Sequence, residues 1–161
     1  MPDLQIIKGK RILAVDDEPD VLEVIQEQLV DCEVFTARNY EAARELILER
    51  VYDLIILDIM GVNGFALLEL SKTRRIPAAM LTAHALTVEN VNRALKLGAV
   101  SFLPKDELAR LPELIAEILN DISEGKSHWE KLFERLGPFF EERLGLVWED
   151  LERPQLPPYR Y

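Results

Sequence analysis

The chain contains a single cysteine, Cys32, so an internal disulfide is excluded. No apolar run approaches the roughly 20 residues that a membrane-spanning helix requires. The first ten residues lack the basic and then apolar layout of a secretory signal. These absences lead us to expect a cytoplasmic protein that does not insert into a membrane.

Positive charge is also in short supply. The 161 residues include 19 lysines and arginines against 29 aspartates and glutamates, which gives a net charge of −10 at pH 7. Direct nucleic-acid binding is therefore not expected, because it requires a basic surface that neutralises phosphates. A basic protein partner is compatible with this charge.

Short apolar runs alternate with helical patterns along most of the chain. Such alternation predicts an α/β fold, with βαβ units that form a doubly wound, parallel, five-stranded sheet. Right-handed crossovers allow few arrangements, among them the flavodoxin-like strand order 2-1-3-4-5. The apolar runs cover 11–15, 33–37, 53–57, 77–81 and 100–103, and the helical patterns cover 21–29, 41–50, 65–72, 88–97 and 107–119.

The alternation ends near Ile122, so we expect one domain over residues 8–122 and an appended segment over 123–161. Ser127 and Glu130 have the spacing of a capping box, which predicts a new helix there. Aromatic and aliphatic residues then recur at helical spacing. The segment is therefore predicted to be a helical extension that finishes in a Pro-rich tail.

Acidic residues follow two of the predicted core strands. Asp16 and Asp17 end the first strand, and Asp58 follows the third. The carboxyl ends of parallel strands open onto one crevice, and strands one and three are neighbours in the order 2-1-3-4-5. Carboxylates so close together repel unless a cation lies between them. Mg²⁺ suits such a site, because it prefers oxygen ligands and keeps several waters.

Two further polar residues stand at strand ends. Thr82 follows the fourth strand and Lys105 follows the fifth. A hydroxyl, an ammonium and a metal ion that face one carboxylate form a site for a phosphoryl group. Asp58 is then a candidate nucleophile for an aspartyl phosphate.

These residues resemble the receiver domain of two-component response regulators, the CheY-like family. The resemblance covers residues from about 8 to 122. It is carried by the whole set in chain order, each member at a strand end, namely Asp16-Asp17, Asp58, Thr82-Ala83 and Phe102-x-Pro104-Lys105. It implies a phosphoacceptor that takes its phosphoryl group from a histidine kinase or a phosphotransfer protein.

The resemblance assigns a ligand set to the metal ion. It implies that Asp58 is both the phosphoacceptor and a ligand of Mg²⁺. Asp17 is expected to bind the ion directly and Asp16 largely through water. The backbone carbonyl of Met60 is expected to complete the set.

The resemblance also implies a switch. Lys105 is expected to hold a phosphoryl oxygen, Thr82 to move toward the phosphoryl group, and Phe102 to turn inward behind it. This movement is expected to change the face made by the fourth helix, fifth strand and fifth helix. Met60 and His84 flank the phosphoryl group and are expected to tune its lifetime.

The segment after Asp58 departs from the family pattern. The family usually has a Met-Pro pair there and a glycine eight residues after the acceptor. In this chain residues 58–64 contain no proline, and Gly64 comes six residues after Asp58. The segment up to Pro77 is also short. We therefore expect a shortened third helix.

The function implied is signalling by protein contacts in a two-component system. No output enzyme is expected. The chemistry expected of the chain is at most self-phosphorylation from phosphodonors and autodephosphorylation. The downstream partner is an unnamed protein, with homodimerisation through the C-terminal helices or the face of the fourth and fifth helices as a further possibility. Two alternatives stay open: a pseudo-receiver regulated without phosphate, and a Mg²⁺-dependent phosphatase with an aspartyl nucleophile.

Overall fold

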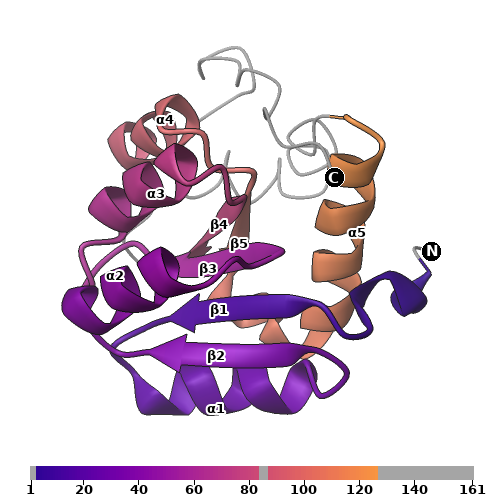
Figure 1. Cartoon of the computed structure of the whole chain (residues 1–161). Coiled ribbons are helices and arrows are strands. Elements are labelled where there is room, and N and C mark those ends of the chain that lie inside the picture. The colour runs from indigo at the N-terminus through magenta and orange to yellow at the C-terminus, as the bar shows by residue number, and fades with distance from the viewer. Residues whose placement is uncertain (1–2, 84–86, 127–161) are drawn as a thin grey trace.

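The computed structural model describes residues 3–83 and 87–126, and within them the chain forms one parallel five-stranded sheet. The strand order is β2-β1-β3-β4-β5, so the predicted flavodoxin-like topology is confirmed. Figure 1 shows the helices arranged on both sides of this sheet. The strands are β1 (Arg11–Val15), β2 (Glu33–Ala37), β3 (Leu54–Asp58), β4 (Ala78–Thr82) and β5 (Ser101–Pro104).

Within the described ranges, five α-helices cover the two faces of the sheet. One hydrophobic cluster joins the sheet to α2, α3 and α4, and a second joins it to α1, α5 and the N-terminal 3-10 turn η1. The α-helices are α1 (Pro19–Gln28), α2 (Tyr40–Glu49), α3 (Gly64–Thr73), α4 (Val88–Lys96) and α5 (Leu111–Ser123), and the 3-10 turns are η1 (Leu4–Ile7) and η2 (Lys105–Arg110).

The central strand β3 explains why one apolar run has no polar alternation. Every residue of β3 is buried, and successive side chains enter opposite clusters. Leu54 and Ile56 pack on the α1 and α5 side, whereas Ile55 and Leu57 pack on the α2, α3 and α4 side. A strand covered by helices on both faces requires apolar residues at every position.

Local signals place the helix starts. Pro19 occupies the first turn of α1, where its missing N–H costs no hydrogen bond. The Asn39 side chain accepts a hydrogen bond from the Ala42 amide at the start of α2. The Thr87 hydroxyl does the same for the Asn90 amide at the start of α4.

The predicted boundaries of the fifth helix were wrong. Residues 105–110 form η2, and α5 begins at Leu111 rather than at 107. Glu107 has non-helical backbone angles, and Pro112 lies in the first turn of α5. Proline is tolerated in the first turn of a helix but disrupts its interior, so a helix that contains Pro112 begins close to it.

The predicted shortening of the third helix is not visible in its length. Helix α3 has ten residues, as many as α1 and α2. The loop between β3 and α3 holds residues 59–63.

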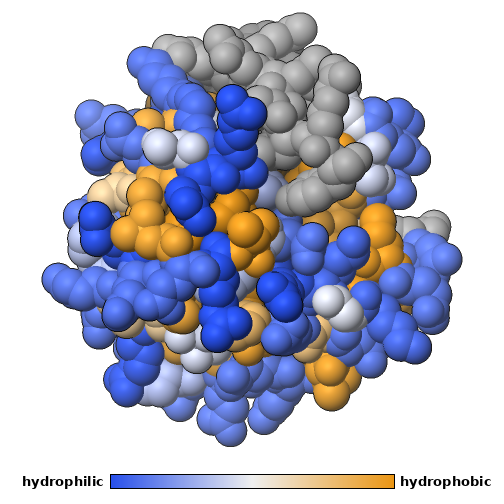
Figure 2. Space-filling view, viewed as in Figure 1, coloured by the Kyte–Doolittle hydropathy of each residue, from blue (hydrophilic) through white to orange (hydrophobic). Residues whose placement is uncertain are grey.

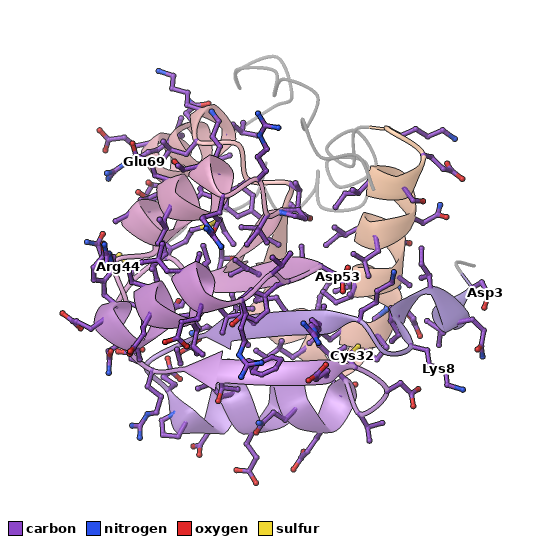
Figure 3. All side chains as sticks on the ribbon, viewed as in Figure 1. Asp3, Lys8, Cys32, Arg44, Asp53 and Glu69 are labelled. Atoms are coloured by element: carbon purple, nitrogen blue, oxygen red, sulfur yellow. The ribbon has the colours of Figure 1, made fainter. Side chains whose placement is uncertain are left out.

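The folded domain begins before residue 8, because the N-terminal turn η1 packs as part of it. This turn packs on α5, and its last residue, Ile7, is buried in the hydrophobic cluster on the α1 and α5 side. Cys32, labelled in Figure 3, lies beside this segment and donates its thiol hydrogen to the Ile7 carbonyl. Burial raises the pKa of Cys32 to about 11, so the thiol stays protonated. Of the predicted extension over 123–161, residues 127–161 lie outside the described residues.

The visible surface is largely hydrophilic, with separate hydrophobic areas (Figure 2). Arg44 on α2 and Glu69 on α3 project outward (Figure 3). Within residues 3–83 and 87–126, no helix has the length and apolar character needed to span a bilayer.

Candidate functional site

The carboxyl ends of four strands bring the predicted polar residues to one edge of the sheet. Asp16 directly follows β1, and Asp58 is the last residue of β3. Val15 is in register with Leu57 between these neighbouring strands, so the two acids extend from adjacent positions. Thr82 ends β4, and Lys105 follows the last residue of β5. The predicted meeting of these strand ends is therefore observed.

The Lys105 ammonium lies at the centre of the site. Its Nζ is 2.9 Å from Asp16 Oδ2 and 3.6 Å from Asp58 Oδ1. It is also 3.4 Å from Glu18 Oε1, at the outer side of the group. Only 13% of the Lys105 side chain is exposed, so its charge acts on these carboxylates with little screening by water.

Asp16 is fully buried, and its two oxygens have different surroundings. Oδ1 accepts a hydrogen bond of 2.8 Å from the Glu18 amide. Oδ2 forms the ion pair with Lys105 but accepts no well-aligned hydrogen bond. A buried carboxylate oxygen in this condition retains the capacity to accept from a further donor or to coordinate a cation.

Burial and mutual repulsion disfavour ionisation of the two inner acids. Burial raises the pKa of Asp58 to about 6, the Asp16 charge adds to the rise, and Lys105 opposes it. Burial also raises the pKa of Asp16, against the Glu18 amide and Lys105. Burial acts to lower the pKa of Lys105, but the neighbouring carboxylates outweigh it and the net pKa is raised. The pocket therefore carries unrelieved negative charge near neutral pH, which favours a bound cation.

The pKa of Asp58 predicts a pH dependence of stability for the metal-free protein. Its pKa rises from 3.8 in the unfolded chain to about 6 in the fold, so the folded state binds the proton more tightly. The resulting stabilisation is present at low pH and is lost as pH rises through about 4 to 7. The expected loss is about 3 kcal/mol.

Urea denaturation in EDTA at several pH values checks this prediction against Asp58→Asn, which removes the titrating group. As pH rises through this window, the free energy of unfolding of the variant should increase relative to that of the wild type. A difference between the two proteins that is constant with pH would contradict the assigned shift.

Three neighbouring acids offer ligand atoms to one cation. Carboxylate oxygens of Asp16, Asp17 and Glu18 all lie within 4.8 Å of one another. Asp58 is not part of this group in the structure, although the sequence predicts it as a ligand. The donor set is oxygen only and includes Asp16 Oδ2, which accepts no well-aligned hydrogen bond, so it fits a hard ion such as Mg²⁺.

Glu18 is the residue that sequence reasoning missed. It reaches both Lys105 and the acidic group, although 63% of its side chain is exposed. The available signal was a third consecutive acid in the run Asp16-Asp17-Glu18 directly before Pro19. The distance of Glu18 from Lys105 depends on the packing of α1 against η2, which no local sequence pattern reports.

The other predicted site residues are placed as follows. Thr82 is buried at the end of β4, and Phe102 is already buried in the cluster on the α2, α3 and α4 side. Met60 is 60% exposed in the loop after Asp58. His84 lies outside the described residues.

The loop between Asp58 and α3 depends on two glycines. Gly61 adopts φ +83°, and Asn63, two residues later, adopts φ +55°. Both values lie in the left-handed region. At Gly64 an added Cβ would overlap the Asp58 carbonyl oxygen and crowd the Ile59 Cα. The loop therefore needs glycine at position 64 because two stretches of backbone approach each other there.

We expect Gly64→Ala to lower the free energy of unfolding by about 2 kcal/mol or more, because rigid backbone must move. Gly9→Ala is the control: this glycine has φ +75° but no atom within 4 Å of an added Cβ. It should cost about 1 kcal/mol from backbone strain. Chemical denaturation measures both values, and an equal loss in the two variants would contradict the overlap.

Comparison with known proteins decides the family. The model of the response regulator receiver domain matches residues 12–118. The chain belongs to this family. The response regulator PilR of Pseudomonas aeruginosa is 36% identical over 117 residues, which cover 68% of this chain and 26% of PilR. The transcriptional regulatory protein DltR of Streptococcus agalactiae is 37% identical over 114 residues, which cover 67% of this chain and 50% of DltR.

Solved structures agree with the fold of this receiver. A CheY-like receiver domain protein from Methanospirillum hungatei has a TM-score of 0.65 and 28% identity, over 71% of this chain and 96% of that one. NtrX from Brucella abortus, solved in complex with ADP, has a TM-score of 0.64 and 32% identity, over 80% of this chain and 30% of that one.

The receiver spans only part of the curated relatives that it matches, about a quarter of PilR and half of DltR. The similarity therefore establishes a response regulator receiver of two-component systems. It does not favour an aspartyl-nucleophile phosphatase, which was the alternative from a different class.

Proposed function

We propose that this receiver is phosphorylated on Asp58 and signals through changed protein contacts. The donor is a histidine kinase or a phosphotransfer protein. The observation that carries the proposal is the position of Lys105, whose ammonium lies between Asp16 and Asp58 at 2.9 and 3.6 Å. A buried cation beside an acidic nucleophile neutralises the charge that an incoming phosphoryl group brings.

The chemistry is a phosphoryl transfer to a carboxylate oxygen. An Asp58 oxygen forms a bond to phosphorus while the bond from phosphorus to the donor's histidine nitrogen breaks, and that nitrogen keeps the electron pair. Asp58 must be ionised to attack, and its pKa of about 6 leaves it mostly ionised at neutral pH. Lys105 opposes the rise of that pKa and then holds a phosphoryl oxygen.

Mg²⁺ would be held by Asp16, Asp17, Asp58 and the Met60 carbonyl, and Glu18 is added by the structure as a neighbouring acid. When bound, the ion supplies further neutralisation of the phosphoryl oxygens. Asp16 contributes the buried oxygen that lacks a hydrogen bond.

The output step is a change in surface contacts. Thr82 donates its hydroxyl to the phosphoryl group, and Phe102 transmits the movement of β4 toward α4, β5 and α5. Met60 and His84 flank the group and tune its lifetime. The downstream target is a protein, or a second copy bound through the α4 and α5 face or the C-terminal extension. Catalysis by the receiver is limited to its own phosphorylation and dephosphorylation.

Intact mass after incubation with acetyl phosphate tests the proposal. The wild type should gain the mass of one phosphoryl group with Mg²⁺ present and none in EDTA. If no gain occurs with acetyl phosphate, beryllofluoride binding separates the remaining cases. Binding would indicate a receiver that requires its own kinase. Absence of binding by the folded protein would overturn the proposal in favour of a pseudo-receiver, for which the short loop after Asp58 is the supporting feature.

A further inference from the structure

The loop of residues 59–63 makes a close approach to the acidic group at Gly61. A Cβ built on Gly61 would lie 2.5 Å from Asp17 Oδ2, 2.7 Å from Asp17 Cγ and 2.9 Å from Asp17 Oδ1. A Cβ in a real protein essentially never comes within 3.0 Å of a heavy atom outside its own residue and the two adjacent ones. The whole Asp17 carboxylate therefore occupies the space that any side chain at position 61 would need.

The loop has little freedom to withdraw from Asp17. It starts at Asp58, the buried last residue of β3, and ends where Gly64 lies against the Asp58 carbonyl. Val62 between these points is buried in the hydrophobic cluster. The backbone at Gly61 is thus anchored on both sides, and the side chain that can yield is Asp17.

Asp17 is exposed, so a substitution at position 61 would turn its carboxylate outward rather than unfold the domain. That movement would separate it from Asp16 and Glu18, whose oxygens now lie within 4.8 Å of its own. The charge of these two acids repels Asp17 and favours the same outward movement.

We propose that Gly61 is a positioning residue for the metal site: its missing side chain lets Asp17 keep its carboxylate beside Asp16 and Glu18. The inference rests on the proposed function, because it assumes that this acidic group binds Mg²⁺. It adds a residue that does not touch the ion and acts through Asp17.

Calorimetric titration of the full chain with Mg²⁺ tests the inference. Gly61→Ala should weaken Mg²⁺ binding by about tenfold or more, the usual effect of losing a group that orients a ligand. Asp17→Asn should weaken it by a similar factor. The double variant should be little weaker than Asp17→Asn alone, because Gly61 acts only through the Asp17 carboxylate.

Two further variants separate positioning from backbone strain. Gly9→Ala places the same strain at φ +75° with open space around the new Cβ, so its Mg²⁺ affinity should equal that of the wild type. Gly61→Asn adds a Cβ at the critical position, but asparagine tolerates the left-handed region better than alanine does. It should lose Mg²⁺ affinity while remaining folded by circular dichroism.

The outcomes are distinguishable. A folded wild type that does not bind Mg²⁺ would remove the metal from the proposed function, and the role of Gly61 with it. Binding by the wild type with unchanged or tighter binding by Gly61→Ala would overturn the role of Gly61 alone. Additive losses in the double variant would assign Gly61 to the adjacent Met60 carbonyl rather than to Asp17, and unfolding of both position-61 variants would assign it to the fold.

Discussion

Asp58→Asn should abolish the phosphoryl mass gain in acetyl phosphate and Mg²⁺ while leaving the domain folded. Asparagine keeps the shape of the side chain, but its amide is a poor nucleophile and carries no charge. The substitution also removes a buried carboxylate whose pKa is raised to about 6 by burial and by Asp16. We therefore expect the metal-free variant to be more stable than the wild type at pH 7.5, by about 3 kcal/mol.

Mass spectrometry of the intact chain measures the phosphorylation, and urea denaturation measures the stability. Asp31→Asn is the matched control, because Asp31 is an exposed acid in the turn between α1 and β2. It should be phosphorylated like the wild type. Phosphoryl mass that persists in Asp58→Asn, located at another residue by peptide mapping, would refute the assignment of the acceptor.

Lys105→Ala should separate phosphorylation from its structural consequence. The variant retains Asp58 and the acidic group, so we expect phosphorylation to continue at a reduced rate. It loses the ammonium that reaches Asp16, Asp58 and Glu18, and with it the link between the phosphoryl group and β5. The phosphorylation-dependent change in α4, β5 and α5 should therefore disappear.

Hydrogen exchange of peptides from this face, with and without beryllofluoride and Mg²⁺, measures the structural change. Lys8→Ala is the control, since this exposed lysine lies near the N-terminus on the η1 side of the domain (Figure 3). The control should respond as the wild type does. A response of Lys105→Ala equal to that of the wild type would show that coupling does not pass through Lys105.

The same variant should lose stability without metal. Removing Lys105 leaves the buried Asp16 carboxylate without its ion pair and beside Asp58. Removal of one partner from a buried pair costs about 3 kcal/mol or more. Added Mg²⁺ should restore part of this loss, because a cation then again offsets the two acids.

Local patterns were sufficient to predict the sheet and the chemistry of its edge. An apolar run that ends on an acid, as at Val15 and Asp16, predicts both a buried strand and the position at which that strand ends. The period of the apolar residues distinguishes strands from helices without knowledge of the partner elements. For this reason the sequence by itself predicted a parallel sheet with Asp16, Asp58, Thr82 and Lys105 at the ends of its strands, whereas the order 2-1-3-4-5 was one of a few that right-handed crossovers allow.

Contacts between distant segments were decided only by the tertiary structure. The approach of Glu18 to Lys105 depends on how α1 packs against η2, and the approach of Gly61 to Asp17 depends on a loop anchored at Asp58 and Gly64. Neither distance is encoded in a local period, because each arises where two separately formed elements are pressed together by core packing. The sequence determined which residues carry the chemistry, and the packing of the fold decided which neighbours hold them in place.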